Sequence, residues 1–428
     1  LTAKSALGGN LLNDVTNIVT GLSVGHIEAM SGGFFKPGDL AAADRMFFSG
    51  LTGVAGDMGN PIKKSKLLLF DELFNVMQDY DTKYRDIKYE ENSFYSKLFN
   101  KSIMFFGNES GEFWLQNRTA LALANNLKLK DRSGNEISLW DALEVVPLDA
   151  NHPNRGYSLK IKNGCKKLDG TEFTKADIAK FSRKSGHINQ RMHGIYNKDD
   201  MNMIQRYTTG RLLMEFRKWI KPQINKKFAK GNISLETGEW EEGYYRTLGR
   251  FLGMVHHEEG GLMYALTTNW NKLDNQDKAN IKRACWDLGI WGLSIGLGML
   301  VSWLGSGYPP DKKPWALKKL EYFIYRFKSD TGMLQPNPFT AISEGMKILS
   351  DPLACIKTIQ DIGHFYEFLM PGNYEFISGK RALVKEGIYK GYSKAEMYFI
   401  KMPFGPMPIY KSWVRSEHVD SLTRFFKQ

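Results

Sequence analysis

Apolar residues recur at helical spacing over the first part of the chain. Residues 11–30 and 40–59 are apolar and rich in small residues, and they predict two helices. A third helix is expected over residues 65–80, where Leu69, Leu73 and Val76 form an apolar face. Two further apolar segments, residues 94–106 and 114–125, predict buried helices.

The pattern changes to strand-like alternation between residues 127 and 173. Polar and apolar residues alternate around Ser133-Gly134-Asn135 and again around Asn163-Gly164, the dipeptide that most favours a two-residue hairpin. Two small antiparallel ribbons are expected, with a helix over residues 138–146 between them. No long series of strands follows, so the sequence predicts a mainly α, multi-helix assembly with a small antiparallel β-hairpin insertion.

Helical spacing returns at Lys175. Asn197 and the acids after it favour the start of a long helix over residues 201–220, which Pro222 is expected to end or kink. Further helices are expected over residues 244–259 and 269–289, and short helices alternate with Pro and Gly breaks at the end of the chain. Four regions follow from this pattern: an N-terminal helical region (1–126), the β insertion (127–173), a central helical region (174–308) and a C-terminal helix-and-loop region (309–428).

One stretch, Leu288 to Leu304, has no charged residue in a chain of which 24% is charged. As a helix it would reach roughly 25 Å, a little less than the hydrocarbon core of a bilayer, about 30 Å. Basic residues flank it and aromatic residues lie near both ends, which is typical of a short membrane span. A central helix buried on all sides gives the same pattern, and we expect a buried helix in the folded chain.

Small residues inside this stretch are spaced for helix packing. Gly292 and Gly296 are four residues apart, as are Ser294, Gly298 and Ser302, and this spacing lets helices approach closely. Residues 292–296 also fit the G-x-S-x-G pattern of hydrolases, but a hydrolase needs a strand before the Ser, and both flanks here are apolar helix. The residues expected in membrane contact or helix packing are Trp291, Gly292, Gly296, Gly298 and Trp303.

Basic residues exceed acidic ones, 58 against 46, which gives a net charge of +12. More than half of this excess falls between Gln205 and Lys230, where Glu215 is the single acid. Such a segment is expected to bind DNA phosphates, to lie on an anionic bilayer, or to form a solvated face paired with acids elsewhere. The candidate contact residues are Arg211, Arg217, Lys218, Lys221, Lys226 and Lys227.

Common catalytic and metal-binding motifs are missing from the sequence. The three cysteines are widely separated, which disfavours a disulfide framework and a zinc finger. The cluster His256-His257-Glu258-Glu259 is expected to be a solvated helix end, because adjacent residues on a helix point about 100° apart and do not converge on one ion. The sequence contains no phosphate-binding glycine motif and no clustered acids for magnesium. We therefore expect no enzymatic activity, metal or cofactor.

Residues 188–228, followed by residues 238–252, resemble a block in the large virion proteins of crAss-like and related tailed phages. The most specific part is GRLLMEFRKWIKPQINKKF, residues 210–228. The order of segments downstream also agrees, with an apolar segment followed by LEYFIYRFKSDTGML at residues 320–334. The resemblance spans residues 60–428.

The resemblance implies a virion cargo protein, carried in the capsid or tail lumen and ejected into the host with the genome. Its partners would be other virion proteins (portal, tail or muzzle components), packaged DNA and, after ejection, the host membrane. The alternatives are a membrane-active component of the DNA-delivery conduit and an accessory domain of a virion RNA polymerase. The polymerase's acidic magnesium motif is absent here. The sequence begins without Met or a signal region, so we expect it to be part of a longer polypeptide.

Overall fold

The computed structural model describes residues 11–57, 64–77, 101–149, 152, 156–194, 207, 220–233, 240–259, 261–309, 312–334, 336–340, 384, 394 and 397. Of these residues 68% are helical, and the strands form small antiparallel pairs. The prediction of a mainly α chain with a small β insertion is therefore confirmed.

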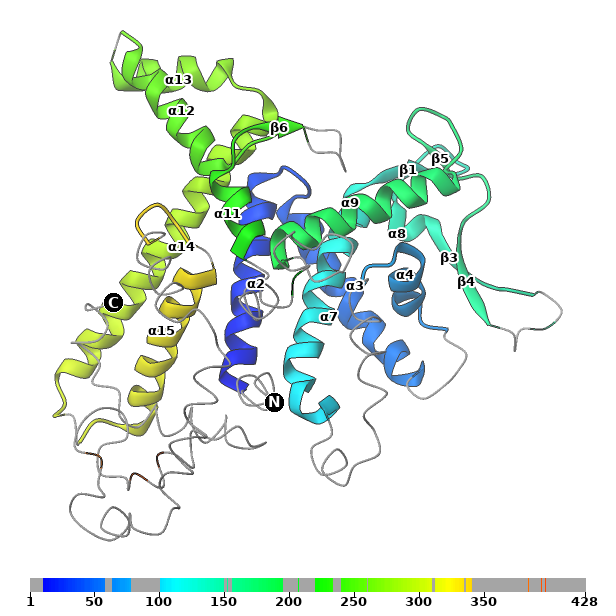
Figure 1. Cartoon of the computed structure of the whole chain (residues 1–428). Coiled ribbons are helices and arrows are strands. Elements are labelled where there is room, and N and C mark those ends of the chain that lie inside the picture. The colour runs from blue at the N-terminus through cyan, green and yellow to red at the C-terminus, as the bar shows by residue number, and fades with distance from the viewer. Residues whose placement is uncertain are drawn as a thin grey trace.

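The N-terminal body is a helical bundle with the largest apolar core of the described chain (Figure 1). It contains α2 (Leu11–Ser31), α3 (Pro37–Asp57), α4 (Lys66–Phe74), α7 (Lys101–Asn126) and α9 (Lys175–His193). Pro37 suits the first turn of α3, where its missing N–H has no helical partner to lose. The largest fully buried apolar side chains of this core are Phe35, Phe70, Phe74, Leu67, Leu121, Leu129, Leu139, Leu143 and Ile188.

Two predicted helix boundaries in this body are wrong. The helix expected over residues 65–80 ends at Phe74, because Asn75 adopts a left-handed conformation with φ 50° and caps it. The apolar segments 94–106 and 114–125 were expected as separate helices. Their described part forms the single helix α7, which continues through Gly111.

The β insertion is paired differently from the prediction. β1 (Lys128–Lys130) and β2 (Glu136–Ser138) form the first expected ribbon. The helix predicted over residues 138–146 is only one turn, α8 (Leu139–Ala142), and the chain continues as β3 (Leu143–Pro147). β3 pairs with β4 (Tyr157–Ile161), while β5 (Lys166–Lys167) pairs with β1. The Asn163-Gly164 turn therefore joins strands of two different sheets, and burial of Leu143 beside Leu159 favours the strand over the helix.

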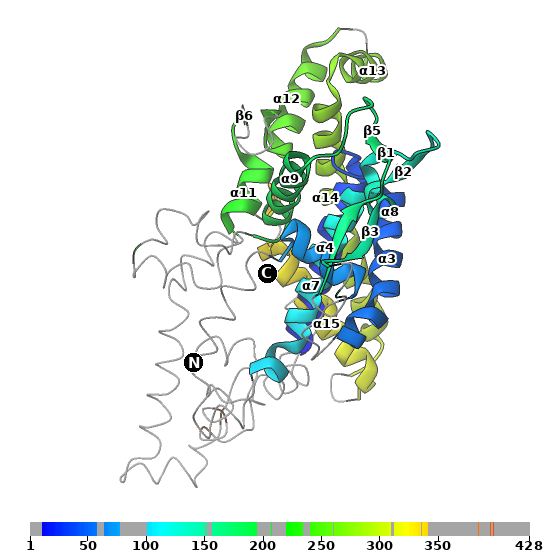
Figure 2. The same cartoon turned by 90° about the vertical axis from the view of Figure 1, so that its right-hand side faces the viewer.

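A second group of elements forms an arm that projects beyond the body, as Figures 1 and 2 show. The arm contains α11 (Ile220–Phe228), β6 (Asn232–Ile233), β7 (Trp240–Glu241), α12 (Tyr244–His257) and α13 (Leu262–Lys272). Pro222 lies in the first turn of α11, where a proline is tolerated; its expected effect on the helix over residues 201–220 stays a prediction, because the segment before Ile220 lies outside the described residues. The helix expected over residues 201–220 lies outside the described residues, apart from Tyr207 and Ile220. Most of the last hundred residues, where short helices were expected, also lies outside them.

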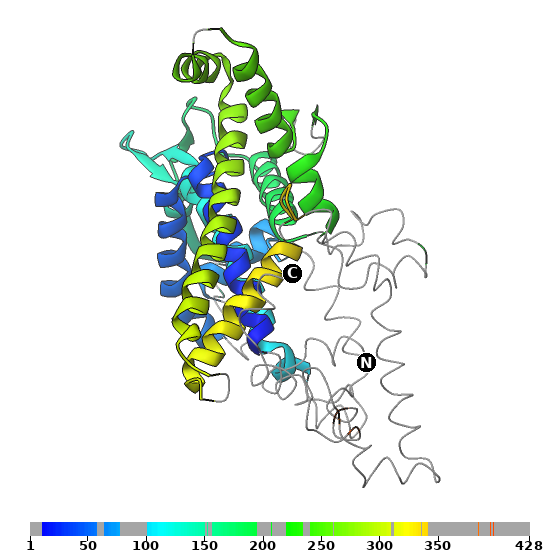
Figure 3. The same cartoon turned by 90° about the vertical axis from the view of Figure 1, so that its left-hand side faces the viewer.

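The long helix α14 (Asn275–Ser306) joins the arm to the body. Figure 3 shows it running from the α12–α13 end of the arm along α2 to α15 (Trp315–Leu334). At the turn between α14 and α15, the Lys313 Nζ lies 2.9 Å from Glu321 Oε1, and both side chains are buried. The Glu321 carboxylate fills the space beside Gly305, where any side chain would collide with it. α14 is thus packed against α12, α2 and α15.

Candidate functional site

The predicted apolar stretch lies in the second half of α14, and only one face of it is buried. The buried residues are Ser294, Gly298, Val301, Ser302 and Gly305, whose spacing of three and four residues marks one side of the helix. The predicted packing role of the Ser294, Gly298 and Ser302 spacing fits this arrangement. With small residues facing inward, α14 can lie close to its neighbours.

The opposite face of this half of α14 carries large apolar side chains in solvent. Leu293 is 63% exposed and Trp303 is 68% exposed, and only 28% of the most apolar 18-residue window is buried. The expectation of a helix buried on all sides is therefore wrong for the described chain, because α2 and α15 cover one face only. We call the exposed set the α14 apolar face: Leu293, Leu297, Met299, Leu300, Trp303 and Leu304.

The remaining predicted residues of this stretch have different surroundings. Trp291 is half-buried, and its ring stacks on Phe339 at 5.5 Å with an interplanar angle of 12°. Gly292 and Gly296 are exposed, and a Cβ at either position would meet no atom within 4 Å. The prediction that these two glycines pack against another helix is wrong within the described residues.

α14 is also the one helix in the described ranges that is long and apolar enough to cross a membrane, with a mean hydropathy of 1.6 over its window. Exposed Lys282 precedes the α14 apolar face and exposed Lys312 follows it. Trp286 and Tyr308, both more than 40% exposed, lie near its two ends. Aromatic residues and cations at the ends of an apolar helix match the two interfaces of a bilayer.

The predicted basic surface is only partly accounted for. Lys221 is exposed on α11, but Lys226 and Lys227 are buried. The expectation that these two lysines project from the surface to contact DNA or an anionic layer is wrong, because α11 turns them toward the junction of the arm with the body. Arg211, Arg217 and Lys218 lie outside the described residues.

Lys227 belongs to a buried cluster around Asp287 of α14. Asp287 Oδ2 accepts hydrogen bonds from Lys227 Nζ at 2.8 Å, from the Tyr244 hydroxyl at 2.9 Å and from the Tyr245 hydroxyl at 2.6 Å. Burial, and next to it the Asp287 charge, raises the pKa of both tyrosines well above the ordinary value, so they remain donors. α11 and α12 are thereby joined to the middle of α14.

One turn earlier, Arg283 joins α14 to α2. Its Nε donates to Glu28 Oε2 at 2.7 Å and its Nη1 donates to Asn280 Oδ1 at 2.8 Å. Burial by itself would raise the pKa of Glu28, but the charges of Arg283, Arg191 and Lys226 together lower it, so the carboxylate stays ionised. The pair spans 255 positions of sequence and ties the arm to the N-terminal body.

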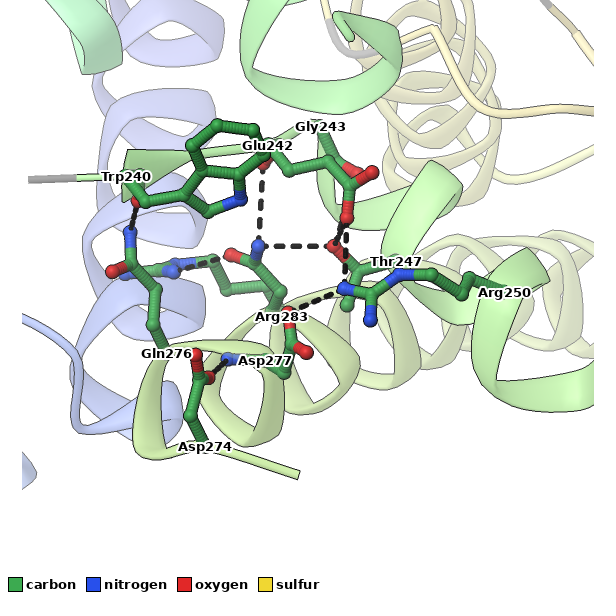
Figure 4. Close-up of polar contacts among 10 residues, drawn as sticks. Trp240, Glu242, Gly243, Thr247, Arg250, Asp274, Gln276, Asp277 and Arg283 are labelled. Atoms are coloured by element: carbon green, nitrogen blue, oxygen red, sulfur yellow. Dashed lines mark hydrogen bonds and ion pairs between the residues drawn. The ribbon is translucent and has the colours of Figure 1, made fainter. Parts of the chain in front are cut away.

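Figure 4 shows how the network continues to the start of α14. Asn280 Nδ2 donates to the Glu242 carbonyl at 3.2 Å and to Thr247 Oγ1 at 3.1 Å. Arg250 bridges Glu242 and Asp277, at 3.1 and 2.7 Å. The first half of α14 is therefore fixed by directional contacts with α2, α11, α12 and the segment before α12, whereas no such ion pair holds its second half within the described residues.

Lys226 lies within this junction without a carboxylate bonded to it in the described residues. Burial, and next to it the neighbouring Lys227 charge, lowers its pKa to about 7. The surrounding charges balance without it, since Arg191, Arg283 and Lys227 oppose Glu28, Glu241 and Asp287. The buried junction therefore has no net charge when the Lys226 amine is deprotonated, and gains one positive charge when it is protonated.

His193 at the end of α9 gives this junction a pH dependence. Burial lowers its pKa to about 4, and Lys226 contributes to the shift. The folded chain therefore holds neutral His193 at a pH where the unfolded chain is protonated, so stability is complete above about pH 6.5 and is lost as pH falls toward 4. We expect the free energy of unfolding to fall by about 2 kcal/mol more in the wild type than in His193→Gln between pH 7 and pH 5.

Urea denaturation at the two pH values measures this difference. Exposed His256→Gln is the control and should retain the wild-type pH dependence. If the free energy of unfolding falls equally in the wild type and in His193→Gln between pH 7 and pH 5, His193 does not titrate in this way.

Sequence reasoning missed the residues that hold α14. Glu28 is separated from Arg283 by most of the chain, and no local pattern links the two. Asp287 did leave a signal, because it is the last acid before the apolar stretch and lies between Trp286 and Leu288. An acid in such surroundings needs a partner when it is buried.

The geometry offers an exposed apolar helix face and a buried polar junction in which Lys227 pairs with Asp287 and Arg283 pairs with Glu28. The described residues hold no cluster of three or more possible metal ligands. A small cavity between α7 and α9, lined among others by Gln116, Asn189 and His193, lies beside the junction. No protein-family model matches this chain, and comparisons with curated proteins and with solved structures found no match either.

Proposed function

We propose that this chain belongs to a tailed-phage virion protein that is ejected into the host with the genome, and that it contacts the host membrane through the α14 apolar face. The exposed large side chains of α14 carry the membrane part of this proposal. The delivery part rests on the resemblance of residues 188–228 and 238–252 to large virion proteins of crAss-like phages.

The physical support is the cost of leaving this face in water. Burying a Leu side chain contributes roughly 1.5–3 kcal/mol relative to leaving it exposed. Six adjacent large apolar residues on one helix face therefore favour transfer to an apolar phase, and contiguous exposed patches of this kind mark interaction sites. The cations at both ends favour an anionic bilayer.

Membrane contact is tested with vesicles of phosphatidylglycerol and phosphatidylethanolamine. The wild-type chain should float with the vesicles, and a variant with Leu293, Leu297, Leu300 and Trp303 all changed to Ser should remain in the soluble fraction. The change removes apolar surface from the α14 apolar face while sparing its buried residues. Circular dichroism shows whether the variant keeps its helices.

The matched control changes Leu148, Leu168 and Ile233 to Ser, since these are also at least half exposed but lie in or beside the small β ribbons. It should float like the wild type. Failure of the wild type to float, or equal loss in the control, contradicts the proposal. Delivery is tested by mass spectrometry of envelopes from infected cells, and persistence of the chain in spent particles would count against it.

A further inference from the structure

The two halves of α14 are held by different kinds of contact. From Asn275 to Asp287, the buried residues include Asn280, Arg283 and Asp287, which bond to α2, α11, α12 and the segment before α12. From Leu288 to Ser306, the buried residues are small apart from Val301. The large side chains of the α14 apolar face are exposed, whereas Leu288, Ile290, Trp291 and Ile295 are partly buried. From Leu293 onward the helix therefore has mainly small residues inside and most of its apolar surface outside.

Glycines without packing contacts lie where the halves meet. Gly289 and Gly292 are exposed, and a Cβ at either position would meet no atom within 4 Å, as is also true of Gly296. Glycine in a helix interior weakens the helix because it loses more conformational freedom than other residues. A close approach by a neighbour would explain such glycines, and the described structure shows none here.

We infer that α14 is hinged at Gly289–Gly292, so that its second half leaves α15 and α2 to enter a membrane while its first half stays attached to the arm and body. The hinge is inferred from the folded chain alone. The membrane step rests on the proposed function.

The unequal contacts explain why the helix would open at this place. Detaching the second half exposes the buried residues Ser294, Gly298, Val301, Ser302 and Gly305 and breaks the Trp291–Phe339 stack, but residues 288–306 carry no charge and so lose no ion pair of their own. Detaching the first half would leave Arg283, Asp287 and their partners as unpaired buried charges, which is far less favourable. The stretch from Gly289 to Ser306 would reach roughly 27 Å as a helix, close to the hydrocarbon thickness of about 30 Å.

The hinge is tested with Gly289→Ala and Gly292→Ala combined in one variant. The open space at both positions admits a methyl group, so the variant should fold and strengthen the helix across the hinge. In hydrogen exchange without lipid, amides of residues 293–304 in the wild type should exchange faster than those of residues 279–287. The variant should slow exchange of residues 293–304 roughly 20-fold, and this slowing corresponds to the helix propensities of two Gly→Ala changes.

The matched control combines Gly249→Ala and Gly253→Ala in α12, where the added methyl groups also meet open space. It should leave exchange in α14 unchanged. Equal exchange in the two halves of wild-type α14, or no slowing in the hinge variant, overturns the hinge.

Membrane entry is measured by protease digestion of the chain bound to the same anionic vesicles. A segment that has entered the bilayer should survive as a protected fragment containing residues 289–306. The hinge variant should give less of this fragment than the wild type, and the α12 control should give the same amount. Equal protection in all three chains overturns the hinged entry. A chain that shows the expected exchange but no vesicle binding retains the hinge and contradicts the proposed function instead.

Discussion

Changing Asp287 to Ala is expected to lower the free energy of unfolding by about 3–5 kcal/mol, the range for removing one partner of a buried ion pair. The change leaves Lys227 and the hydroxyls of Tyr244 and Tyr245 without their common acceptor. Burial already lowers the pKa of Lys227, and without Asp287 nothing within the cluster offsets that effect. Urea denaturation followed by circular dichroism measures the loss.

Two further variants show whether the loss of stability comes from breaking the buried Lys227–Asp287 pair or from removing a charge in general. Lys227→Met added to Asp287→Ala should recover part of the lost stability, because the unpaired amine is removed together with its partner. Glu258→Gln breaks the exposed pair with Lys272 and should leave the denaturation midpoint nearly unchanged. If Asp287→Ala is as stable as Glu258→Gln, the cluster does not hold α14.

Changing Arg283 to Met is expected to lower stability by a similar amount, about 3–5 kcal/mol. Glu28 would remain with 2% of its side chain exposed and without its partner at 2.7 Å. The guanidinium also lies 5.0 Å from the centre of the Phe34 ring, a contact that Met keeps only in its apolar part. Thermal and urea denaturation at neutral pH provide the measurement.

The pH dependence of this variant gives an independent readout. Without Arg283, burial dominates and should raise the pKa of Glu28 above its ordinary value in the folded chain. A raised carboxyl pKa means that the folded state binds the proton more tightly than the unfolded state. The difference in the free energy of unfolding between the wild type and Arg283→Met should therefore shrink as pH is lowered toward 5. Glu28→Gln combined with Arg283→Met should remove this pH effect, and a deficit independent of pH in the single variant would contradict the assignment.

Both changes act on the anchored half of α14, and neither alters the α14 apolar face. The functional assignment therefore does not depend on them. A chain whose anchor is weakened should still bind vesicles if it folds, whereas a chain without the exposed leucines should not. The two sets of variants thus separate stability from membrane contact.

Local patterns were sufficient where a segment folds through its own neighbours. The helices α2, α3 and α12, the β1–β2 ribbon and the α14 helix itself follow from apolar spacing and turn residues, because these signals act over a few positions. The exposed end of α12 at His256-His257 was also predicted from helix geometry. The strand β3 was missed because its pairing with β4 depends on burial of Leu143 and Leu159 in a core contributed by distant helices.

The apolar character and length of α14 were determined by the sequence alone, since seventeen consecutive uncharged residues leave little choice other than burial or a lipid phase. The tertiary structure alone decided which side is covered. α2 and α15 pack on the side of Ser294, Gly298 and Ser302, and Leu293, Leu300 and Trp303 are left in solvent. It also turned Lys226 and Lys227 inward, because Asp287 and Glu28 approach them from positions that no local pattern connects. Charge placement of this kind depends on long-range packing, and a linear sequence pattern does not contain it.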